Sequence, residues 1–402
     1  MKALREINSM KFPIYLDHNA TTPCDTKVLG AMMPWFMEQY GNASSIHHPF
    51  GWMAEEAVEI AREQLATLIG AYPKEIVFTS GATEAINLGI RGVMEANPDK
   101  GNHLITVATE HKAVLDTCEV LEKKGTAVSY LPVKEDGLID LEELEGAIRP
   151  DTVMIIIMMA NNETGVIQPI REISVLAKEY GLILLSDAVQ AVGKIPVEVK
   201  SFGIDLMPLS AHKMYGPKGV GALYIRSTNP KIELVSQITG GGQEKGRRSG
   251  TLNVPGIVGL GQAAEIAQQQ MAAEQERLHR LRGFLEKNLL EIKGTHLNGP
   301  TALRLPHVSH ISFEGVEGKE LLIAINKELA VSSGSACSSI TTKPSHVLSA
   351  MGIRDDLARS SLRFGLGRST TEAQMEFAVR YVKETVHSLR GKKKLDSKSY
   401  MQ

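Results

Sequence analysis

Short apolar runs alternate with longer segments of helical periodicity along most of the chain. The apolar runs lack the polar alternation of strands that face water on one side, so each is predicted to form a strand covered on both faces. These strands are expected at residues 75–79, 103–107, 154–159, 182–185 and 222–225. Helical patterns separate them, at residues 52–69, 112–124, 141–148 and 170–180. The alternation of strand and helix predicts an α/β fold with a mostly parallel sheet wrapped by helices.

A long helical pattern at residues 258–293 marks the passage to a second part of the chain. Two further strands and a helix follow it, at residues 308–313, 362–364 and 319–329. This mixture predicts a small α+β domain at residues 1–23 and 263–390, beside a large domain at residues 24–262. The basic segment 391–402 is expected to form a flexible, solvated tail.

Length and composition limit the classes of protein that fit. The 402 residues exceed what one ordinary hydrophobic core holds, and a net charge of −2 gives no reason to expect a nucleic acid or membrane partner. The chain has neither a run of about 20 apolar residues nor a signal-peptide pattern. Its three cysteines are widely separated and form no Cys-x-x-Cys motif, so neither disulfides nor a structural metal is expected. A cytoplasmic location fits these features best.

Polar side chains follow several of the predicted strands, and α/β sheets bind their ligands at the carboxyl ends of strands. Asp187 ends one buried run, and Lys213 stands among small, glycine and proline residues. This pair fits a site for pyridoxal phosphate, because a carboxylate can keep the pyridine nitrogen protonated and a lysine can hold the cofactor as a Schiff base. A structural salt bridge for Asp187, and a surface basic pair of His212 with Lys213, are the alternatives that the residues leave open.

Three further motifs are predicted at the same edge of the sheet. Residues 78–85 run from a strand into a helix, where main-chain N–H groups and the Thr83 hydroxyl could face an anion. An ordinary helix cap is the alternative for this turn. His111 directly follows a strand and could stack on a cofactor ring and move protons, or have a purely structural role. The amide of Asn162, in a turn after another strand, could reach the same ligand.

The remaining candidates lie on a loop, a strand and a serine-rich segment. The glycine-rich loop at residues 240–251 carries two arginines and could bind phosphate from a neighbouring subunit, although it fits no Walker pattern. Arg363 could clamp a substrate carboxylate, with a sheet-edge salt bridge as the alternative. Cys337 lies in a segment rich in serine and glycine and is not flanked by a run of apolar residues, which favours an exposed, reactive thiol. Cys24 and Cys118 have no comparable context and are expected to be structural.

Together these motifs resemble the IscS/NifS-type cysteine desulfurases, a branch of the fold-type I pyridoxal phosphate enzymes. The most specific pieces lie at residues 15–23, 77–84, 109–115, 161–165, 212–219, 248–251 and 332–337. The serine-rich segment around Cys337 is similar to the longer loop of the IscS-like group. The resemblance implies a homodimer that converts L-cysteine to L-alanine and leaves the sulfur on Cys337 as a persulfide.

The resemblance also implies a role for each candidate residue. Lys213 would bind the cofactor and move protons, Asp187 would pair with the pyridine nitrogen, and His111 would stack on the ring. The rest of the cofactor would be held by Asn162, Gln190, Ala82, Thr83, Ser210, His212 and, across the dimer interface, Thr251. The substrate carboxylate would bind Arg363, aided by Asn42.

The acceptor of the persulfide sulfur is left open by the resemblance. IscS relatives usually continue into a segment that docks an iron–sulfur scaffold protein, whereas this sequence ends soon after Arg390. A scaffold or carrier protein is expected to receive the sulfur, for iron–sulfur clusters or for thiolation of tRNA or DNA. The alternative on the same fold is a selenocysteine lyase or another class-V enzyme, which would not need Cys337. Gly365 departs from the family pattern, which more often has serine there.

Overall fold

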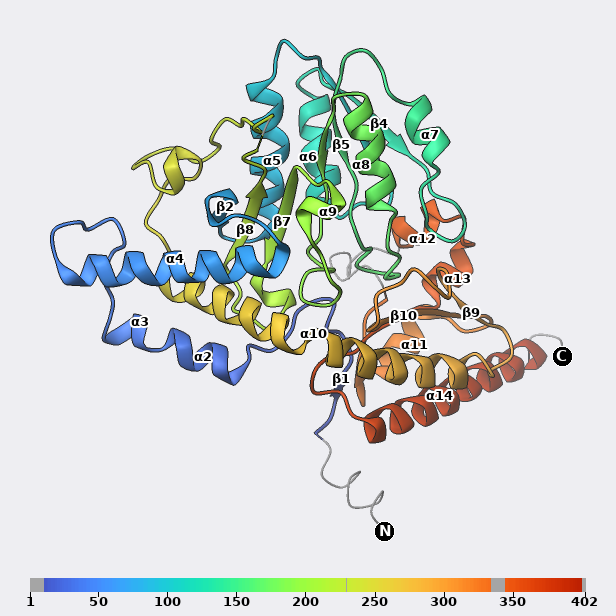
Figure 1. Cartoon of the computed structure of the whole chain (residues 1–402). Coiled ribbons are helices and arrows are strands. Elements are labelled where there is room, and N and C mark those ends of the chain that lie inside the picture. Colours follow the sequence, from blue (N-terminus) through green and yellow to red (C-terminus); the bar gives the residue numbers. More distant parts are fainter. Residues whose placement is uncertain (1–10, 229, 334–343, 400–402) are drawn as a thin grey trace.

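A seven-stranded sheet lies at the centre of the larger part of the molecule (Figure 1). The computed structural model describes residues 11–228, 230–333 and 344–399. In order across the sheet, the strands are β2 (Ile76–Thr79), β8 (Gly221–Ile225), β7 (Leu206–Ser210), β6 (Ile183–Leu185), β5 (Thr152–Ile156), β3 (His103–Val107) and β4 (Ala127–Leu131). Within this sheet β8 runs antiparallel to both its neighbours, and the other strands share one direction. The predicted α/β fold with a mostly parallel sheet is confirmed.

Two of these strands, β4 and β7, escape the sequence pattern. Strand β7 contains Pro208, a residue that argues against a central strand because it cannot donate a ladder hydrogen bond. Strand β5 ends at Ile156, although its apolar run continues to Met159. Beyond Ile156 the pairing with the segment of β6 continues, since Ile157 donates to the carbonyl of Leu185 at 3.0 Å and Met159 to that of Asp187 at 2.8 Å. The N–H of Met158, between them, donates to the Glu110 carboxylate at 2.6 Å.

Helices cover both faces of the sheet, as the unbroken apolar strands predict. One face packs against α2 (Thr26–Met32), α4 (Pro49–Ile69), α7 (Leu141–Gly146), α8 (Ile170–Glu179), α9 (Val199–Phe202) and the first part of α10 (Val254–Leu289). The other face packs against α5 (Ala82–Ala96) and α6 (Lys112–Glu122). Successive residues of β5 alternate between the two, because Ile155 lies in the first core and Met154 and Ile156 lie in the second.

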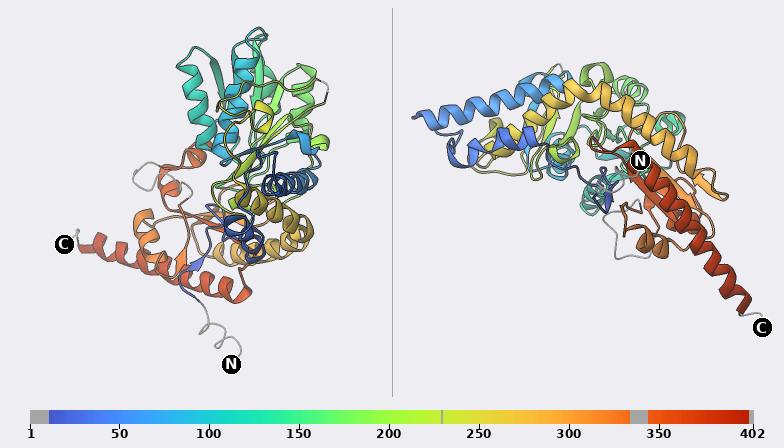
Figure 2. Two further views of the ribbon diagram at one scale, coloured as in Figure 1. Left: turned by 90° about the vertical axis from the view of Figure 1, so that its left-hand side faces the viewer. Right: turned by 90° about the horizontal axis from the view of Figure 1, so that it is seen from below.

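A separate core contains the last part of the chain. It is built on an antiparallel sheet of β12 (Ser361–Gly365), β10 (Val308–Phe313) and β9 (Thr295–Leu297), with α11 (Gly318–Ile325) and α14 (Glu372–Ser399). The second half of α10 joins this core beside α14, as Figure 2 shows. Ile14 and Leu16 are also part of it, and β1 (Ile14–Tyr15) pairs in parallel with β11 (Leu329–Ala330). The N-terminal residues therefore share a core with the C-terminal ones, while the exact domain boundaries stay a prediction.

The remaining elements are short. They are α3 (Pro34–Met37), α12 (His346–Ala350), α13 (Asp355–Arg359) and the 3-10 helices η1 (Pro73–Glu75), η2 (Ala211–Lys213) and η3 (Glu244–Gly246). Helix α14 continues to Ser399, into the segment expected to be a tail, because no proline interrupts the sequence there. None of the helices in the described residues is long and apolar enough to span a membrane.

Candidate active site

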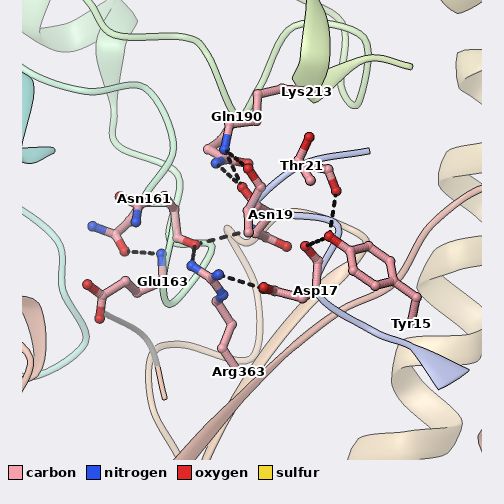
Figure 3. A network of polar contacts seen from close by, with 11 residues as sticks. Tyr15, Asp17, Asn19, Thr21, Asn161, Glu163, Gln190, Lys213 and Arg363 are labelled. Atoms are coloured by element: carbon pink, nitrogen blue, oxygen red, sulfur yellow. Dashed lines mark hydrogen bonds and ion pairs between the residues drawn. The ribbon is translucent and has the colours of Figure 1, made fainter. Parts of the chain in front are cut away.

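The carboxyl ends of the parallel strands bring most of the candidate residues to one edge of the sheet. His111 follows β3, Asn162 follows β5, and Asp187 and Gln190 follow β6. Lys213 ends η2, directly after β7. Figure 3 shows part of the resulting network, in which side chains of the sheet edge meet the N-terminal segment. A ligand bound here would contact residues from four strands.

Lys213 reaches the N-terminal segment of the chain. Its Nζ donates to the main-chain carbonyl oxygen of Asn19 at 2.5 Å and to that of Ala20 at 2.7 Å (Figure 3). Gln190 donates to the same Asn19 oxygen through Nε2 at 3.0 Å. The lysine amine therefore lies within reach of two polar groups that precede the first helix of the chain.

The turn that carries Lys213 is anchored on both sides. The Thr22 hydroxyl donates to the carbonyl of His212 at 2.8 Å and accepts from the N–H of Tyr215 at 2.8 Å. Tyr215 has a φ of 65°, in the left-handed region that residues other than glycine rarely adopt. The ring of His212 contacts the Thr21 hydroxyl through Nδ1 at 3.1 Å, and burial next to Lys213 lowers the pKa of His212 to about 4. The backbone around the lysine is thus held in one conformation.

Asp187 is a buried carboxyl group at the end of β6. Its side chain accepts a hydrogen bond from the N–H of Val189 at 3.0 Å, and the residue is 6 % exposed. Burial raises the pKa of Asp187, and this effect is opposed by the Val189 N–H and by the nearby charges of His111 and Lys213. A cationic group placed against this carboxyl would stabilise its charged form.

His111 is near Asp187 and follows a second buried carboxyl group, Glu110, in the chain. The Nδ1 atom of His111 accepts from the N–H of Ala113 at 3.1 Å and caps α6. Burial lowers the pKa of His111, so the neutral ring, whose Nδ1 is an acceptor, carries its proton on Nε2. Glu110 is fully buried, and its burial raises the pKa of its carboxyl well above the usual range.

The turn from β2 to α5 has the geometry of an anion cradle. Gly81 has a φ of 152°, and a Cβ there would meet no atom within 4 Å, which leaves open space above the first N–H groups of α5. Glu84 fixes the turn, because its carboxylate accepts from the N–H of Ser80 at 2.9 Å and from Arg248 Nε at 2.7 Å. Arg248 belongs to the glycine-rich loop, so that loop is joined to the cradle.

Arg363 points from β12 toward the same site and is 2 % exposed. Its Nη2 donates to Asp17 at 2.7 Å, and its Nη1 donates to the carbonyl oxygen of Asn162 at 3.0 Å (Figure 3). The alternative weighed for this arginine, a salt bridge, is therefore present. Since Asp17 and Asn162 both border the site, the ion pair also fixes the direction of the guanidinium group.

Comparison with known proteins places the whole chain in one family. The family model described as Aminotransferase class-V matches residues 14–377. The protein named Cysteine desulfurase IscS from Anaeromyxobacter sp. (strain Fw109-5) is 54 % identical over 382 residues, 95 % of this chain and 94 % of the relative. The protein of the same name from Escherichia coli O139:H28 is 50 % identical over 383 residues, with the same coverage.

Solved structures agree with this assignment. A chain titled NIFS-LIKE PROTEIN superposes with a TM-score of 0.88 at 38 % identity and covers 94 % of this chain and 100 % of its own. A chain titled "SspA in complex with cysteine" has a TM-score of 0.77 at 38 % identity, over 88 % of this chain and 98 % of its own. The protein belongs to the class-V aminotransferase family and, within it, to the cysteine desulfurases. The fold-type I architecture implied by the sequence is thereby confirmed.

Within one chain of the desulfurase, two of the predicted residues that the structure describes, Asn42 and Thr251, are not gathered with the others. Asn42 is exposed in the loop between α3 and α4, at the end of α4 that projects from the body (Figure 1), and its side chain accepts from the N–H of Ser44 at 2.9 Å. Thr251 is exposed after the glycine-rich loop. Cys337 lies outside the described residues.

The desulfurase sequence also contains site residues that the strand-end argument misses. Asn19 accepts from Lys213, and Asp17 pairs with Arg363, yet both precede the first strand of the large sheet. Their sequence signals are the mostly polar residues 17–22 after the apolar Ile14 and Leu16, and the family motif at residues 15–23, neither of which places them at a strand end. Pairing of this segment with β11 and β12 carries it into the site.

Proposed function

We propose that this cysteine desulfurase uses pyridoxal phosphate, held at Lys213 and Asp187, and transfers the sulfur of L-cysteine to Cys337. One observation carries the proposal: a buried carboxyl group, Asp187, a neutral histidine that caps α6, His111, and the anchored Lys213 meet at one edge of the sheet. The structure titled as SspA in complex with cysteine supports L-cysteine as the substrate. The relatives named as cysteine desulfurases support the same reaction.

The residues present fit pyridoxal phosphate at both of its ends. A pyridine nitrogen that carries a proton would supply the cationic partner that the buried carboxyl of Asp187 favours. At the other end, the open cradle at Gly81, the N–H groups of Ala82 and Thr83 and the side chains of Ser210 and His212 can hold a phosphate. Thr251 would complete the phosphate site from a partner subunit.

When bound, pyridoxal phosphate supplies an electron sink that stabilises negative charge on the substrate carbon next to the amine. Lys213 would accept and return a proton at that carbon through Nζ. His111, whose Nε2 carries the proton, can stack on the ring and donate a hydrogen bond. Gln190 and Asn162 would bind the hydroxyl side of the ring, and the fixed guanidinium of Arg363 would bind the substrate carboxylate.

Cys337 is proposed as the sulfur acceptor because the described residues on both sides of its segment are attached to the site. On one side, Ser332 pairs with Arg363, and the main-chain N–H of Arg363 donates to the Ser332 carbonyl at 2.7 Å. On the other side, the Ser345 hydroxyl donates to the Glu163 carboxylate at 2.5 Å. A selenocysteine lyase on the same fold remains the alternative, and it would not require Cys337.

Removal of the cofactor is expected to abolish activity reversibly. Apoprotein should release almost no alanine from L-cysteine, because its own side chains provide no electron sink. Pyridoxal phosphate should restore the rate, whereas pyridoxal should not, since it has no phosphate for the cradle. Alanine is measured over time after dialysis and after each addition. Full activity of protein shown to contain no cofactor would contradict the proposal.

The desulfurase is further proposed to be a homodimer that buries an exposed apolar surface. We define this α2–α4 surface by large apolar side chains on α2, α3, α4 and the connecting loop: Leu29, Phe36, Met37, Tyr40, Ile46, Phe50 and Trp52. Tyr40 is 69 % exposed and Ile46 is 65 % exposed. Large apolar side chains exposed on neighbouring elements in this number are usually covered by a partner. A second copy of the chain would also bring Thr251 to a neighbouring cradle.

Charge placed on this surface is expected to separate the subunits. The double change Phe36→Glu and Met37→Glu should weaken dimerisation by about 100-fold or more, because it buries two carboxylates in an apolar interface. Light scattering of the eluting protein measures the mass. Tyr180→Glu, at a residue 48 % exposed on another part of the surface, is the control and should stay dimeric. A wild-type monomer with full activity would contradict the dimer.

A further inference from the structure

Asn19 connects three of the residues assigned to the active site. Its main-chain oxygen accepts from Lys213 and Gln190, and its Nδ2 donates to the carbonyl oxygen of Asn162 at 3.2 Å. That Asn162 oxygen also accepts from Arg363. Asn19 itself is 1 % exposed. One residue of the N-terminal segment therefore touches the groups proposed to bind both the cofactor and the substrate.

Space for Asn19 depends on Gly365. The two segments are paired, because the N–H of His18 donates to the Gly365 carbonyl at 3.0 Å and Gly365 donates to the carbonyl of Leu16 at 2.7 Å. A Cβ on residue 365 would overlap Oδ1 of Asn19 and lie 3.0 Å from the main-chain nitrogens of Asn19 and His18. A side chain at this position would therefore displace Oδ1 of Asn19 and crowd the main chain of the Asn19 segment.

Gly365 is not required by the backbone. It lies in β12 and is absent from the glycines of positive φ, so an alanine could adopt its conformation. Oδ1 of Asn19 is buried and has no hydrogen-bond partner among the described residues, so no donor draws that atom away from residue 365. The missing side chain at position 365 thus serves to admit Asn19. This gives a structural meaning to the departure of Gly365 from the family pattern.

We propose that Asn19 is a positioning residue for Lys213 and that Gly365 is the position that admits it. The carbonyl oxygens of Asn19 and Ala20 hold the Lys213 amine whenever it is not bonded to the cofactor. Two carbonyl acceptors fix the position of Nζ, so the amine meets the cofactor from a defined place. The inference rests on the proposed role of Lys213. It adds that Asn19 holds the amine of Lys213 when this amine is not bonded to the cofactor.

The capture of cofactor by apoprotein tests this role directly. Pyridoxal phosphate is mixed with apoprotein, and the rise of visible absorbance gives the rate at which Lys213 bonds to it. Gly365→Ala should slow capture by about tenfold or more, because displacement of Asn19 moves the carbonyl that holds Nζ. Asn19→Ala retains that carbonyl and should change the rate by about threefold or less. The double variant should recover to within about threefold of wild type, because the overlapping Oδ1 atom is gone.

A control separates this role from a general disturbance of the segment. A Cβ on Gly367 would overlap the His18 ring. His18 is the neighbour of Asn19, and among the described residues Lys213 bonds to Asn19 and Ala20 and not to His18. Gly367→Ala should lower the melting temperature and leave the capture rate within about threefold of wild type. Equal slowing by Gly365→Ala and Gly367→Ala, or no rescue in the double variant, would overturn the role of Asn19. Absence of visible absorbance in wild type would instead reject the cofactor assignment itself.

Discussion

Replacement of Lys213 by alanine is expected to abolish the visible absorbance of the bound cofactor and to lower alanine release by roughly 10³-fold or more. The amine of Lys213 is the group that would bond to pyridoxal phosphate, and it lies on a turn anchored by Thr22 and directed at Asn19. No other lysine follows β7 in this position, since Lys218 is exposed further along the chain. Both binding and proton movement would be lost together.

The matched control for this experiment is Lys218→Ala. It removes an exposed lysine five positions away and should leave the absorbance and the rate close to wild type. Absorbance spectra between pH 6 and pH 9 and alanine release are recorded for all three proteins. An unchanged spectrum or near-normal activity in Lys213→Ala would contradict the role of Lys213.

The second large effect is expected at Cys337. Cys337→Ala should reduce sustained alanine release from L-cysteine by roughly 100-fold or more, because the substrate sulfur would have no thiolate to attack it. The cofactor should still bind normally, since Lys213 and Asp187 are unchanged. This combination of a normal spectrum with a lost rate distinguishes the acceptor thiol from a residue that holds the cofactor.

Cys24 provides the control for Cys337. It is the exposed cysteine of the described residues, and burial together with Asp25 raises the pKa of its thiol, which makes it a poor nucleophile. Cys24→Ala should therefore keep near-normal activity. Undiminished turnover in Cys337→Ala would favour the selenocysteine lyase alternative or another class-V activity.

The sequence predicts the large sheet well because its strands are buried on both faces and give continuous apolar runs. The exceptions have local causes. Strand β7 contains Pro208 yet pairs on both sides, and it is held by its neighbours β6 and β8 rather than by its own preference. Past the end of β5, the N–H of Met158 is bound by the buried carboxylate of Glu110, a distant contact that no local pattern reveals.

The residues of the candidate site likewise divide into those that the sequence predicts and those that it does not. His111 and Asp187 could be found from the sequence because each follows a predicted strand of the parallel sheet, and Lys213 because it stands among small, glycine and proline residues. Asn19 could not, because it acts through a main-chain oxygen that reaches the site only when its segment pairs with β12. Asn42 is the opposite case. Its role is predicted from the resemblance to relatives, which does not say where the residue lies, and in one chain it is exposed near the end of α4.

The most direct measurement follows the sulfur itself. Protein containing pyridoxal phosphate is mixed with one equivalent of L-cysteine without reductant, and alanine and the mass of each cysteine-containing peptide are measured together. The account predicts one alanine for each persulfide, with the added sulfur on the Cys337 peptide and none on Cys24 or Cys118. Alanine without a persulfide on Cys337, or added sulfur on another cysteine, would contradict it.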